Sequence, residues 1–294
     1  MEDIKIILKE KAIEVNEKLR DIMNIKEKVI SDTLLEAMNY TLFSGGKRIR
    51  PILTILTAEL IGANVEEAKK AGIAIELIHT YSLIHDDLPA MDNDDFRRGK
   101  LSNHKIFGDG IAILTGDALL TYAFEILSEL KLEPQKVLKI ITLVSCDSGF
   151  NGMVGGQVLD LEGEGKNISF NELKKIHGAK TGALFRTSIL LGVYCGNYTE
   201  SEFLALSNYA KYLGLCFQIV DDILDLTGDA KKLGKKVGRD SELNKATYPA
   251  FMGLENARLE AQKVADKAKS YLQIFGDKAQ TLKNLLDFII ARQN

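Results

Sequence analysis

Residues 79–92 run His79-Thr80-Tyr81-Ser82-Leu83-Ile84-His85-Asp86-Asp87-Leu88-Pro89-Ala90-Met91-Asp92, an apolar helical stretch that leads into three aspartates. A second stretch of the same character runs Phe217-Gln218-Ile219-Val220-Asp221-Asp222-Ile223-Leu224-Asp225. Carboxylates are least expected next to such apolar runs. If the six acids came together, each pair would repel by roughly 3 kcal/mol at ~6 Å and an effective dielectric near 20. Such a cluster is stable only with cations.

The ligand chemistry of these acids favours magnesium. They are hard oxygen donors with no cysteine or histidine between them, which is typical of Mg²⁺ sites rather than of zinc sites. A Mg²⁺ ion held by a few carboxylates completes its shell with water and with the phosphates of a substrate. The two clusters therefore predict a site that binds a diphosphate group through magnesium.

Composition predicts a soluble, all-α protein. The 294 residues are 46% hydrophobic, with four prolines and no tryptophan, and no run has the alternation of a β-hairpin. The net charge of −3 gives no reason to expect a nucleic-acid partner or an anionic membrane surface. Three widely spaced cysteines and an N-terminus without a signal-peptide profile suit a reducing cytoplasm. The apolar run 110–127 contains Asp117 and Glu125, so we expect a core helix and no membrane insertion.

The hydrophobic periodicity predicts one helical bundle domain over residues 1–294 with no linker. Breaks are expected at Gly45-Gly46, Pro89, Glu133-Pro134 and Gly196-Asn197. The predicted helices cover residues 3–22, 29–43, 50–62, 65–87, 109–129, 134–149, 171–193, 200–226, 246–273 and 277–291.

The second acidic cluster has helical spacing. Asp221 and Asp225 are four residues apart and share a helix face, and Gln218 lies on that face one turn earlier. Asp222 points about 100° away, which suits either a supporting residue or one that faces solvent. An exposed helix face is the alternative for the whole group, but its apolar surroundings count against that.

The first acidic cluster is interrupted by a proline. Pro89 disfavours the α conformation at Leu88, so we expect the helix to end near Asp87 or Leu88. The chain can then fold back and bring Asp92 beside Asp86. A solvated acidic turn, balanced by Arg97 and Arg98, is an equally good interpretation of this segment taken alone.

Histidine and arginine residues near the clusters suggest contacts with phosphate. His79 lies two turns before Asp86 on the same helix face and can donate a hydrogen bond, whereas His85 points elsewhere and is expected to be structural. Basic residues form four short groups, any one of which could be an ordinary solvated charge run. Together with two acidic clusters they favour polyanion binding. The groups are Gly45-Gly46-Lys47-Arg48-Ile49-Arg50, Arg97-Arg98, Lys180-Thr181-Gly182 and the segment 231–245, which contains Lys235 and Lys245 and is expected to form a basic lid.

Several common enzyme motifs are missing from the sequence. There is no GxxxxGK[ST] loop, no GxGxxG after a strand, no GxSxG elbow and no HExxH. P-loop hydrolysis, dinucleotide binding, serine-nucleophile chemistry of the elbow type and zincin chemistry are therefore not predicted.

In combination, these motifs closely resemble those of the trans-isoprenyl diphosphate synthases, particularly the bacterial farnesyl diphosphate synthases. The resemblance covers about residues 40 to 250. It rests on both aspartate motifs and on further segments between and before them: Gly45 to Pro51, His79 to Asp87, Arg97-Arg98-Gly99, Leu114-Thr115-Gly116-Asp117, Gly156-Gln157 with Asp160, and Lys180-Thr181-Gly182.

This resemblance implies an all-α isoprenoid-synthase bundle around a deep central cavity, in a homodimer. Asp86 and Asp92 would hold two Mg²⁺ ions and Asp221 with Asp225 a third, with Asp87 and Asp222 as supports. The remaining roles are also implied by the resemblance alone. Isopentenyl diphosphate would be held by Gly46, Lys47, Arg50, His79 and Arg98; the allylic diphosphate (dimethylallyl or geranyl) and the reacting carbon would be lined by Arg97, Lys180, Thr181, Gln218, Lys235 and Lys245.

The reaction implied is ionisation of the allylic carbon–oxygen bond, followed by attack of the isopentenyl double bond on the carbocation. Main-chain carbonyls of Lys180 and Thr181, with Gln218, would stabilise that cation. Released diphosphate is the expected base, and water must be excluded. Two features depart from the family pattern: Leu101-Ser102 in place of Pro-Thr, and a C-terminus less basic than in many relatives.

Chain length is the open question within this family. An aromatic residue at the position of Tyr81, five before Asp86, is associated there with a C15 product, because its ring blocks the growing tail about 7.5 Å down the helix axis. If Tyr81 packs sideways, Ser82 opens the cavity to a C20 product. We expect farnesyl diphosphate, with geranylgeranyl diphosphate as the alternative. A terpene cyclase needs no second diphosphate site, and a non-catalytic subunit would be expected to lack some of the six aspartates.

Overall fold

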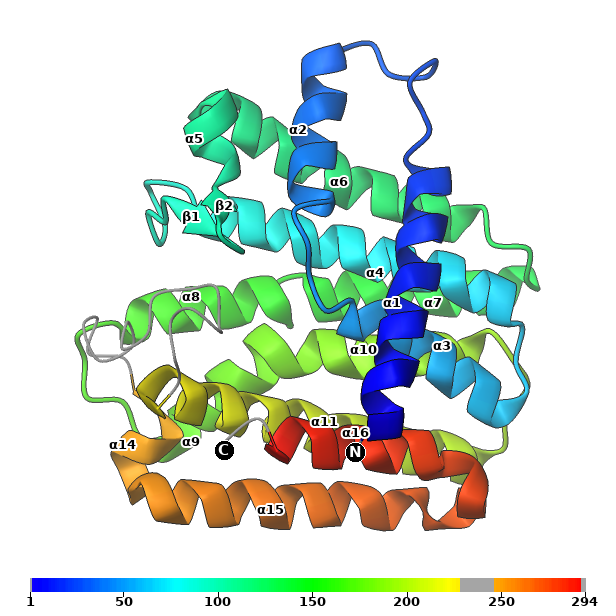
Figure 1. Cartoon of the computed structure of the whole chain (residues 1–294), viewed down its shortest axis with the longest axis vertical. Coiled ribbons are helices and arrows are strands. Elements are labelled where there is room, and N and C mark those ends of the chain that lie inside the picture. The colour runs from blue at the N-terminus through cyan, green and yellow to red at the C-terminus, as the bar shows by residue number, and fades with distance from the viewer. Residues whose placement is uncertain (1, 228–245, 292–294) are drawn as a thin grey trace.

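The computed structural model describes residues 2–227 and 246–291 (Figure 1). In chain order the helices are α1 (Glu2–Ile22), α2 (Asp32–Leu42), α3 (Ile49–Ile61), α4 (Val65–Asp86), α5 (Asn103–Phe107), α6 (Asp109–Ser128), α7 (Pro134–Ser148), α8 (Met153–Gly163), α9 (Phe170–His177), α10 (Ala183–Tyr194), α11 (Glu200–Thr227), α14 (Tyr248–Met252), α15 (Leu254–Tyr271) and α16 (Gln280–Ala291). A π-helical segment, η1 (Gly178–Gly182), joins α9 to α10, and a 3-10 segment, η2 (Leu272–Ala279), precedes α16. The strands β1 (Phe96–Arg97) and β2 (Lys100–Leu101) form a short antiparallel hairpin.

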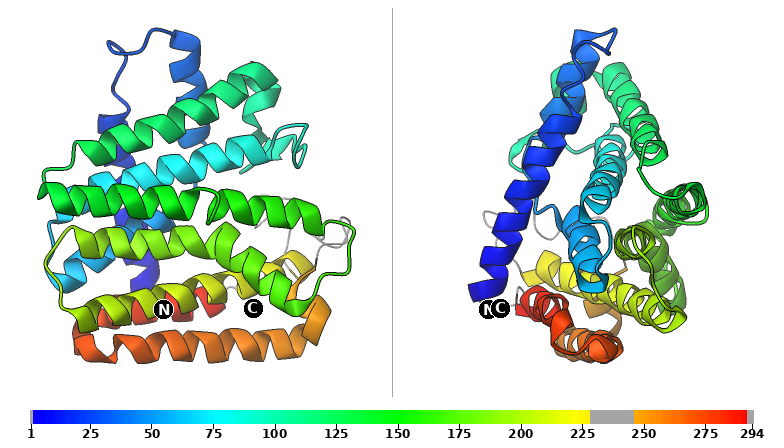
Figure 2. Two further views of the ribbon diagram at one scale, coloured as in Figure 1. Left: turned by 180° about the vertical axis from the view of Figure 1, so that it is seen from behind. Right: turned by 90° about the vertical axis from the view of Figure 1, so that its right-hand side faces the viewer.

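Most of the long helices lie side by side across the molecule, and α1 and α2 run across them (Figure 1). Helix α4 packs against α3 and α6, α10 packs against α3 and α11, and α15 covers the outer side of α11. Figure 2 shows several of these helices nearly end-on in its right-hand view. The expected all-α class is confirmed, and the two-residue strands form the single sheet of the described residues.

Local sequence signals account for where many helices begin. The side chains of Ser31, Asn64 and Ser169 each accept a hydrogen bond from a backbone N–H in the first turn of the helix that follows. These contacts satisfy donors that a helix leaves unpaired at its N-terminus. Pro134 occupies the first turn of α7, where its missing N–H is not needed.

Apolar residues of these helices form a continuous buried cluster that extends from Ile4 in α1 to Ile289 in α16. Helices α3 and α10 are buried on almost every side, as expected for central helices. Contacts between segments far apart in sequence include Tyr209, whose hydroxyl donates to the carbonyl of Leu282 at 3.0 Å. The prediction of one domain agrees with this shared core and stays a prediction.

The predicted helix pattern was wrong in four places, the shortest of which is α5, a helix that was not predicted. Helix α8 was not predicted, because its glycines Gly155, Gly156 and Gly163 resemble loop punctuation. The helix expected over 171–193 changes to π-helical geometry in η1. The helix expected over 246–273 is interrupted at Gly253, whose φ of +79° a side chain would disfavour.

The elements that carry the sequence motifs lie at one end of the bundle. The C-terminal end of α4, the β1–β2 hairpin, α8 and α9 all lie toward the left of Figure 1. Segment η1 contacts both α8 and α11 there. Segment η1 therefore brings α8 and α11 together at this end.

Two apolar stretches, Asp109–Ser128 and Pro134–Gly163, are long enough and apolar enough to cross a membrane by length and composition alone. The first is helix α6, which packs along α4 and α2, and the second begins with α7, which packs against α10. Both stretches are thus part of the bundle. The expectation of no membrane insertion stays a prediction.

Close packing of α10 on α3 depends on Gly192. A Cβ atom at this position would lie 2.5 Å from the carbonyl oxygen of Thr54 and 2.7 Å from the Cβ atom of Thr57. We therefore expect Gly192→Ala to lower the free energy of unfolding by about 2 kcal/mol, measured by denaturant titration, since overpacking forces the backbone to move. Gly110→Ala is the matched control, because a Cβ there meets nothing within 4 Å. Equal stability of both variants would contradict the packing argument.

Candidate active site

Helix α4 ends at Asp86 and the chain folds back on itself. The backbone N–H of Asp92 donates to the carbonyl of Asp86 at 2.8 Å, and that of Asp94 donates to the carbonyl of Asp87 at 3.1 Å. Asn93 takes up the reversal with a φ of +50°, a conformation that asparagine tolerates. The fold-back expected from Pro89 therefore exists, and it brings Asp92 next to the helix end.

The Asp86 carboxyl is under electrostatic strain. Its pKa is raised to about 6, chiefly by burial. The charges of Lys180 and Arg97 oppose this rise, whereas those of Asp92 and Asp87 add to it. Burial and like charges both disfavour an ionised carboxylate. A cation at this position would relieve both effects.

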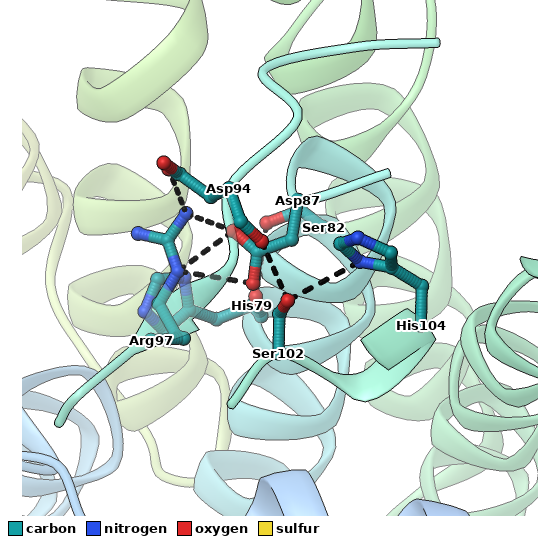
Figure 3. A network of polar contacts seen from close by, with 7 residues as sticks. All are labelled: His79, Ser82, Asp87, Asp94, Arg97, Ser102 and His104. Carbon is teal, nitrogen blue, oxygen red and sulfur yellow. Dashed lines mark hydrogen bonds and ion pairs between the residues drawn. The ribbon is translucent and has the colours of Figure 1, made fainter. Parts of the chain in front are cut away.

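Asp87 points the other way and anchors the hairpin. Its carboxylate accepts two hydrogen bonds from Nε of Arg97, at 2.9 and 3.2 Å, and a further close one from Nη2 of the same side chain (Figure 3). Asp94 lies 3.4 Å from the same guanidinium, and Ser102 donates to the carbonyl of Asp94. Arg97 is thus bound by protein carboxylates here, and its expected contact with a diphosphate stays a prediction.

The π-helical segment η1 carries Lys180 and Thr181, both half-buried. The Nζ atom of Lys180 donates to Asp160 of α8 at 2.7 Å. Close approach is possible because Gly156 has no side chain: a Cβ there would lie 2.3 Å from the backbone nitrogen of Lys180. Gly214 plays the same part on α11, where a Cβ would lie 3.1 Å from Gly182. Isolated π-helical turns often occur at functional sites.

The second acidic cluster lies in the last two turns of α11. Asp221 is half-buried, and Asp225 is buried. Asp222 is buried as well, so it does not face solvent, and the alternative of a supporting residue remains. It accepts hydrogen bonds from the backbone N–H of Tyr248 and from Nε2 of Gln218, both at 2.9 Å. Gln218 was expected to act along the Asp221–Asp225 face, but the same four-residue spacing pairs it with Asp222.

Sequence reasoning missed two aromatic residues behind this cluster. His177 stacks on Tyr248 with ring centroids 5.8 Å apart, and its Nε2 lies 3.9 Å from Asp222. Burial lowers the pKa of His177 to about 4, so the ring is neutral at physiological pH. The only sequence signal was the position of His177 just before Lys180.

The charges of the two acidic clusters interact through η1. The charge of Lys180 lowers the pKa of the Asp86 carboxyl and also that of His177. His177 in turn responds to the charges of Asp160 and Asp221. One residue of each cluster therefore lies within electrostatic range of η1 and its neighbour His177: Asp86 through Lys180, and Asp221 through His177.

A separate group of cations lies before α3. Gly45 and Gly46 have φ values of +109° and +133°, and the Arg98 guanidinium lies under Gly46, only 2.9 Å from where a Cβ would be. Arg98 also donates to the carbonyl of Gly45. It occupies a type I′ position of the hairpin with Gly99, since both residues have positive φ. The hairpin thus holds Arg98 against the glycine loop.

Arg50 belongs to this cationic group, and His79 lies within range of its charges. The guanidinium of Arg50 lies 5.2 Å from the centre of the Phe185 ring, and its buried Nε has no hydrogen-bond partner among the described residues. Burial, with the nearby charge of Arg98, lowers the pKa of Arg50 to about 10, so it stays charged at neutral pH. The pKa of His79 is well below its ordinary value because of burial and the arginines around it. A neutral His79 can still donate one hydrogen bond.

Tyr81 lies below Asp86 on α4 and is buried. Its ring makes an edge-to-face contact with His85, with centroids 5.6 Å apart. His85 in turn contacts the carbonyl of Ile113 at 3.0 Å and lies against Gly116, where a Cβ would be 2.1 Å from its Nε2. The structural role expected for His85 is therefore specific, since it supports Tyr81. Ser82 is half-buried and donates to the carbonyl of His79.

The residues present fit magnesium, although they would not surround it. Among the described residues, no three Asp, Glu, His or Cys side chains converge closely enough to hold an ion by themselves. This suits Mg²⁺, which takes one or two carboxylates and fills the remaining positions with water and phosphate oxygens. The strained carboxyl of Asp86 beside Asp92 is such a partial donor set. Lys47 is exposed, and the expected lid with Lys235 and Lys245 lies outside the described residues.

The raised pKa of Asp86 gives a stability prediction. The folded chain holds this proton more tightly than the unfolded chain, whose Asp has a pKa near 3.8, so stability is lost as pH rises toward about 6. We expect Asp86→Asn to raise the free energy of unfolding of metal-free protein at pH 8 by on the order of 1–3 kcal/mol, and by less at pH 5. Denaturant titration in chelator measures this. Asp277→Asn, at an exposed position, is the control; a pH-independent effect of Asp86→Asn would contradict the argument.

Comparison with known proteins identifies the family. Residues 31–286 match the family model described as Polyprenyl synthetase. A farnesyl diphosphate synthase of Micrococcus luteus is 44% identical over 280 residues, which cover 93% of this chain and 96% of that protein. A chloroplastic geranylgeranyl pyrophosphate synthase of Capsicum annuum is 44% identical over 296 residues, covering 99% of this chain and 79% of that protein. A geranyltransferase from Legionella pneumophila has a crystal structure that covers 99% of this chain and 98% of its own, with a TM-score of 0.88 at 35% identity. The resemblance deduced from the motifs is confirmed, and the chain belongs to the polyprenyl synthetase family.

Proposed function

We propose that this chain condenses isopentenyl diphosphate with dimethylallyl or geranyl diphosphate and releases farnesyl diphosphate. The observation that supports the proposal is that Asp86 of one acidic cluster and His177, which is influenced by Asp221 of the other, both respond to the charge of Lys180, while a separate group of arginines acts on His79. Two diphosphates of different roles need two such sites. One site contains carboxylates for a magnesium-bound leaving group, and the other contains cations for a group that stays attached.

The allylic diphosphate is assigned to the acidic side. Magnesium, when bound, would neutralise the charge that develops on the leaving diphosphate. Asp86 and Asp92 on one wall, and Asp221 and Asp225 on the other, are the proposed ligands. Lys180, whose charge acts on Asp86, is proposed to stabilise the negative charge that develops on the leaving group.

Carbon–carbon bond formation is assigned to the region around η1. A π-helical turn leaves backbone carbonyls without their ordinary helical geometry, and the carbonyls of Lys180 and Thr181 are proposed to face the carbocation. The Gln218 side chain is held by Asp222, so its own carbonyl oxygen is oriented by that contact. These dipoles stabilise positive charge without acting as nucleophiles.

Isopentenyl diphosphate is assigned to Gly46, Lys47, Arg50, His79 and Arg98. The glycine at position 46 leaves room above the Arg98 guanidinium, which a side chain would occupy. Burial of Arg50 supports this assignment, because a charge without a hydrogen-bond partner at its Nε favours a bound anion. Lys235 and Lys245 are proposed to complete the allylic side.

A C15 product is proposed on the basis of Tyr81. Its ring is fixed by His85, which is in turn held between Ile113 and Gly116, so the ring cannot easily move away from a growing tail. Relatives bear both farnesyl and geranylgeranyl names, which leaves a C20 product as the second candidate. A non-catalytic subunit is less well supported, because all six aspartates are present.

Assembly as a homodimer in the cytoplasm is also proposed. Helices α6 and α7 expose Leu114 and Leu138, each more than half exposed, and these are candidates for residues of the dimer contact. A second copy that packs on this surface would cover them. The same contact would shield the two apolar stretches from solvent.

Turnover is the first test. Purified chain with isopentenyl diphosphate, geranyl diphosphate and Mg²⁺ should release farnesyl diphosphate, and a chelator should abolish the reaction. Asp86→Asn and Asp221→Asn should each lower kcat by on the order of 10²-fold or more, since each removes charge that acts on the leaving group. Asp277→Asn should turn over as the wild type does. No product from any pair of allylic and isopentenyl substrates would refute the proposal.

Product length is tested separately. Tyr81→Ala removes the proposed floor and should shift the main product from C15 to C20 or longer, measured by chromatography of the dephosphorylated prenyl alcohols. Tyr81→Phe keeps the ring and should keep the C15 product. An unchanged product from Tyr81→Ala would show that another residue sets the chain length.

A further inference from the structure

Arg48 and Glu76 form a buried ion pair that the proposed reaction does not use. Nη1 of Arg48 lies 2.7 Å from Oε1 of Glu76, and the two side chains are 1% and 2% exposed. Glu76 stands in the middle of α4 between Ile75 and Leu77, both fully buried. Burying two charges contributes little net stability, because their desolvation offsets their attraction. The pair therefore calls for an explanation beyond folding.

The side chain of Arg48 donates its hydrogen bonds to other groups of the protein. Its Nε donates to Asn16 at 3.0 Å, and its Nη2 donates to the carbonyl of Leu42. Its backbone has a φ of +51°, an uncommon conformation for arginine, which turns the side chain away from the glycine loop as α3 begins. Arg48 is thus unlike its neighbour Arg50, whose Nε has no partner among the described residues.

Glu76 is a carboxylate whose charge acts on both Arg50 and Arg98. Its charge attracts both Arg50 and Arg98 and raises the pKa of each, against the lowering caused by burial. An unpaired glutamate at this depth would be a strong competitor for both guanidiniums. In the structure Glu76 instead accepts a direct hydrogen bond from Arg48.

We propose that Arg48 is a positioning residue that neutralises Glu76 and thereby leaves Arg50 and Arg98 available for a diphosphate. Glu76 balances the cationic group while the site is empty, and Arg48 prevents it from capturing the ligand-binding arginines. The inference rests on the proposed assignment of Arg50 and Arg98 to isopentenyl diphosphate. Neither Arg48 nor Glu76 contacts the substrate in this scheme.

A double-mutant cycle tests this role. Arg48→Gln leaves Glu76 unpaired and should raise KM for isopentenyl diphosphate at least tenfold, while KM for geranyl diphosphate changes less than threefold. Glu76→Gln removes the competing charge, so the double variant Arg48→Gln/Glu76→Gln should bring KM for isopentenyl diphosphate back to within about threefold of the wild type. Glu76→Gln alone should bind at least as tightly as the wild type. A purely structural pair predicts instead that the double variant is no better than Arg48→Gln.

Binding of magnesium-free inorganic pyrophosphate, measured by calorimetry in chelator, gives the same comparison without turnover. Affinity should fall at least tenfold in Arg48→Gln and recover in the double variant. Arg186→Gln breaks an ion pair with Asp147 on another face of α10 and is the control, with unchanged affinity. Should Arg48→Gln fail to fold, as judged by its thermal midpoint, Glu76→Gln decides the question, since weaker binding by it would overturn the proposal. If the wild type binds pyrophosphate but forms no prenyl product, the proposed function fails while this binding pattern still tests the inference.

Discussion

The partial burial of like charges at one end of a helical bundle is the constraint on which this structure depends. Carboxylates gather on two helices and guanidiniums gather beside them, in a region too poorly hydrated to screen them well. The protein balances most of these charges internally through supporting pairs. These pairs are Arg97 with Asp87, Lys180 with Asp160, and Arg48 with Glu76.

The charged groups outside these supporting pairs indicate which ligand the site would bind. The pKa of Asp86 is raised and that of Arg50 is lowered, so each group is held away from its ordinary state in opposite directions. A cation relieves the first and an anion relieves the second. Under the proposed function, the cation is a metal ion bound to one diphosphate and the anion is a second diphosphate.

Interruptions of regular helices place the functional groups, and glycines permit the close contacts that hold them. Helix α4 ends at Asp86, and η1 widens to π-helical geometry at Lys180. Gly156 and Gly214 let α8 and α11 approach η1 on its two sides. The regular parts of the same helices form the core, so the bundle can hold the site rigidly although the site itself is irregular.

Helix α4 also links two properties that would otherwise be independent. It ends in the first aspartate cluster, and one turn lower it carries Tyr81, which is proposed to limit product length. The contact of Tyr81 with His85, and of His85 with Gly116, ties the position of this ring to the packing of α6. Under the proposed role of Tyr81, product length would depend on the packing of α4 against α6 as well as on the residue at position 81.

Sequence alone determined the helical class, most helix bounds, the fold-back at Pro89 and the family, because periodicity, proline geometry and ordered motifs are local properties. It also identified the aspartates and most basic residues of the candidate site. Only the tertiary structure decided which polar groups pair with one another: Gln218 with Asp222, Arg97 with Asp87, and the buried Glu76 with Arg48. The tertiary structure also decided that α8 is a helix, because Gly156, which resembles a loop residue in the sequence, packs against η1. Pairings across the bundle depend on how helices approach, and helical spacing cannot choose between partners that are equally close along the chain.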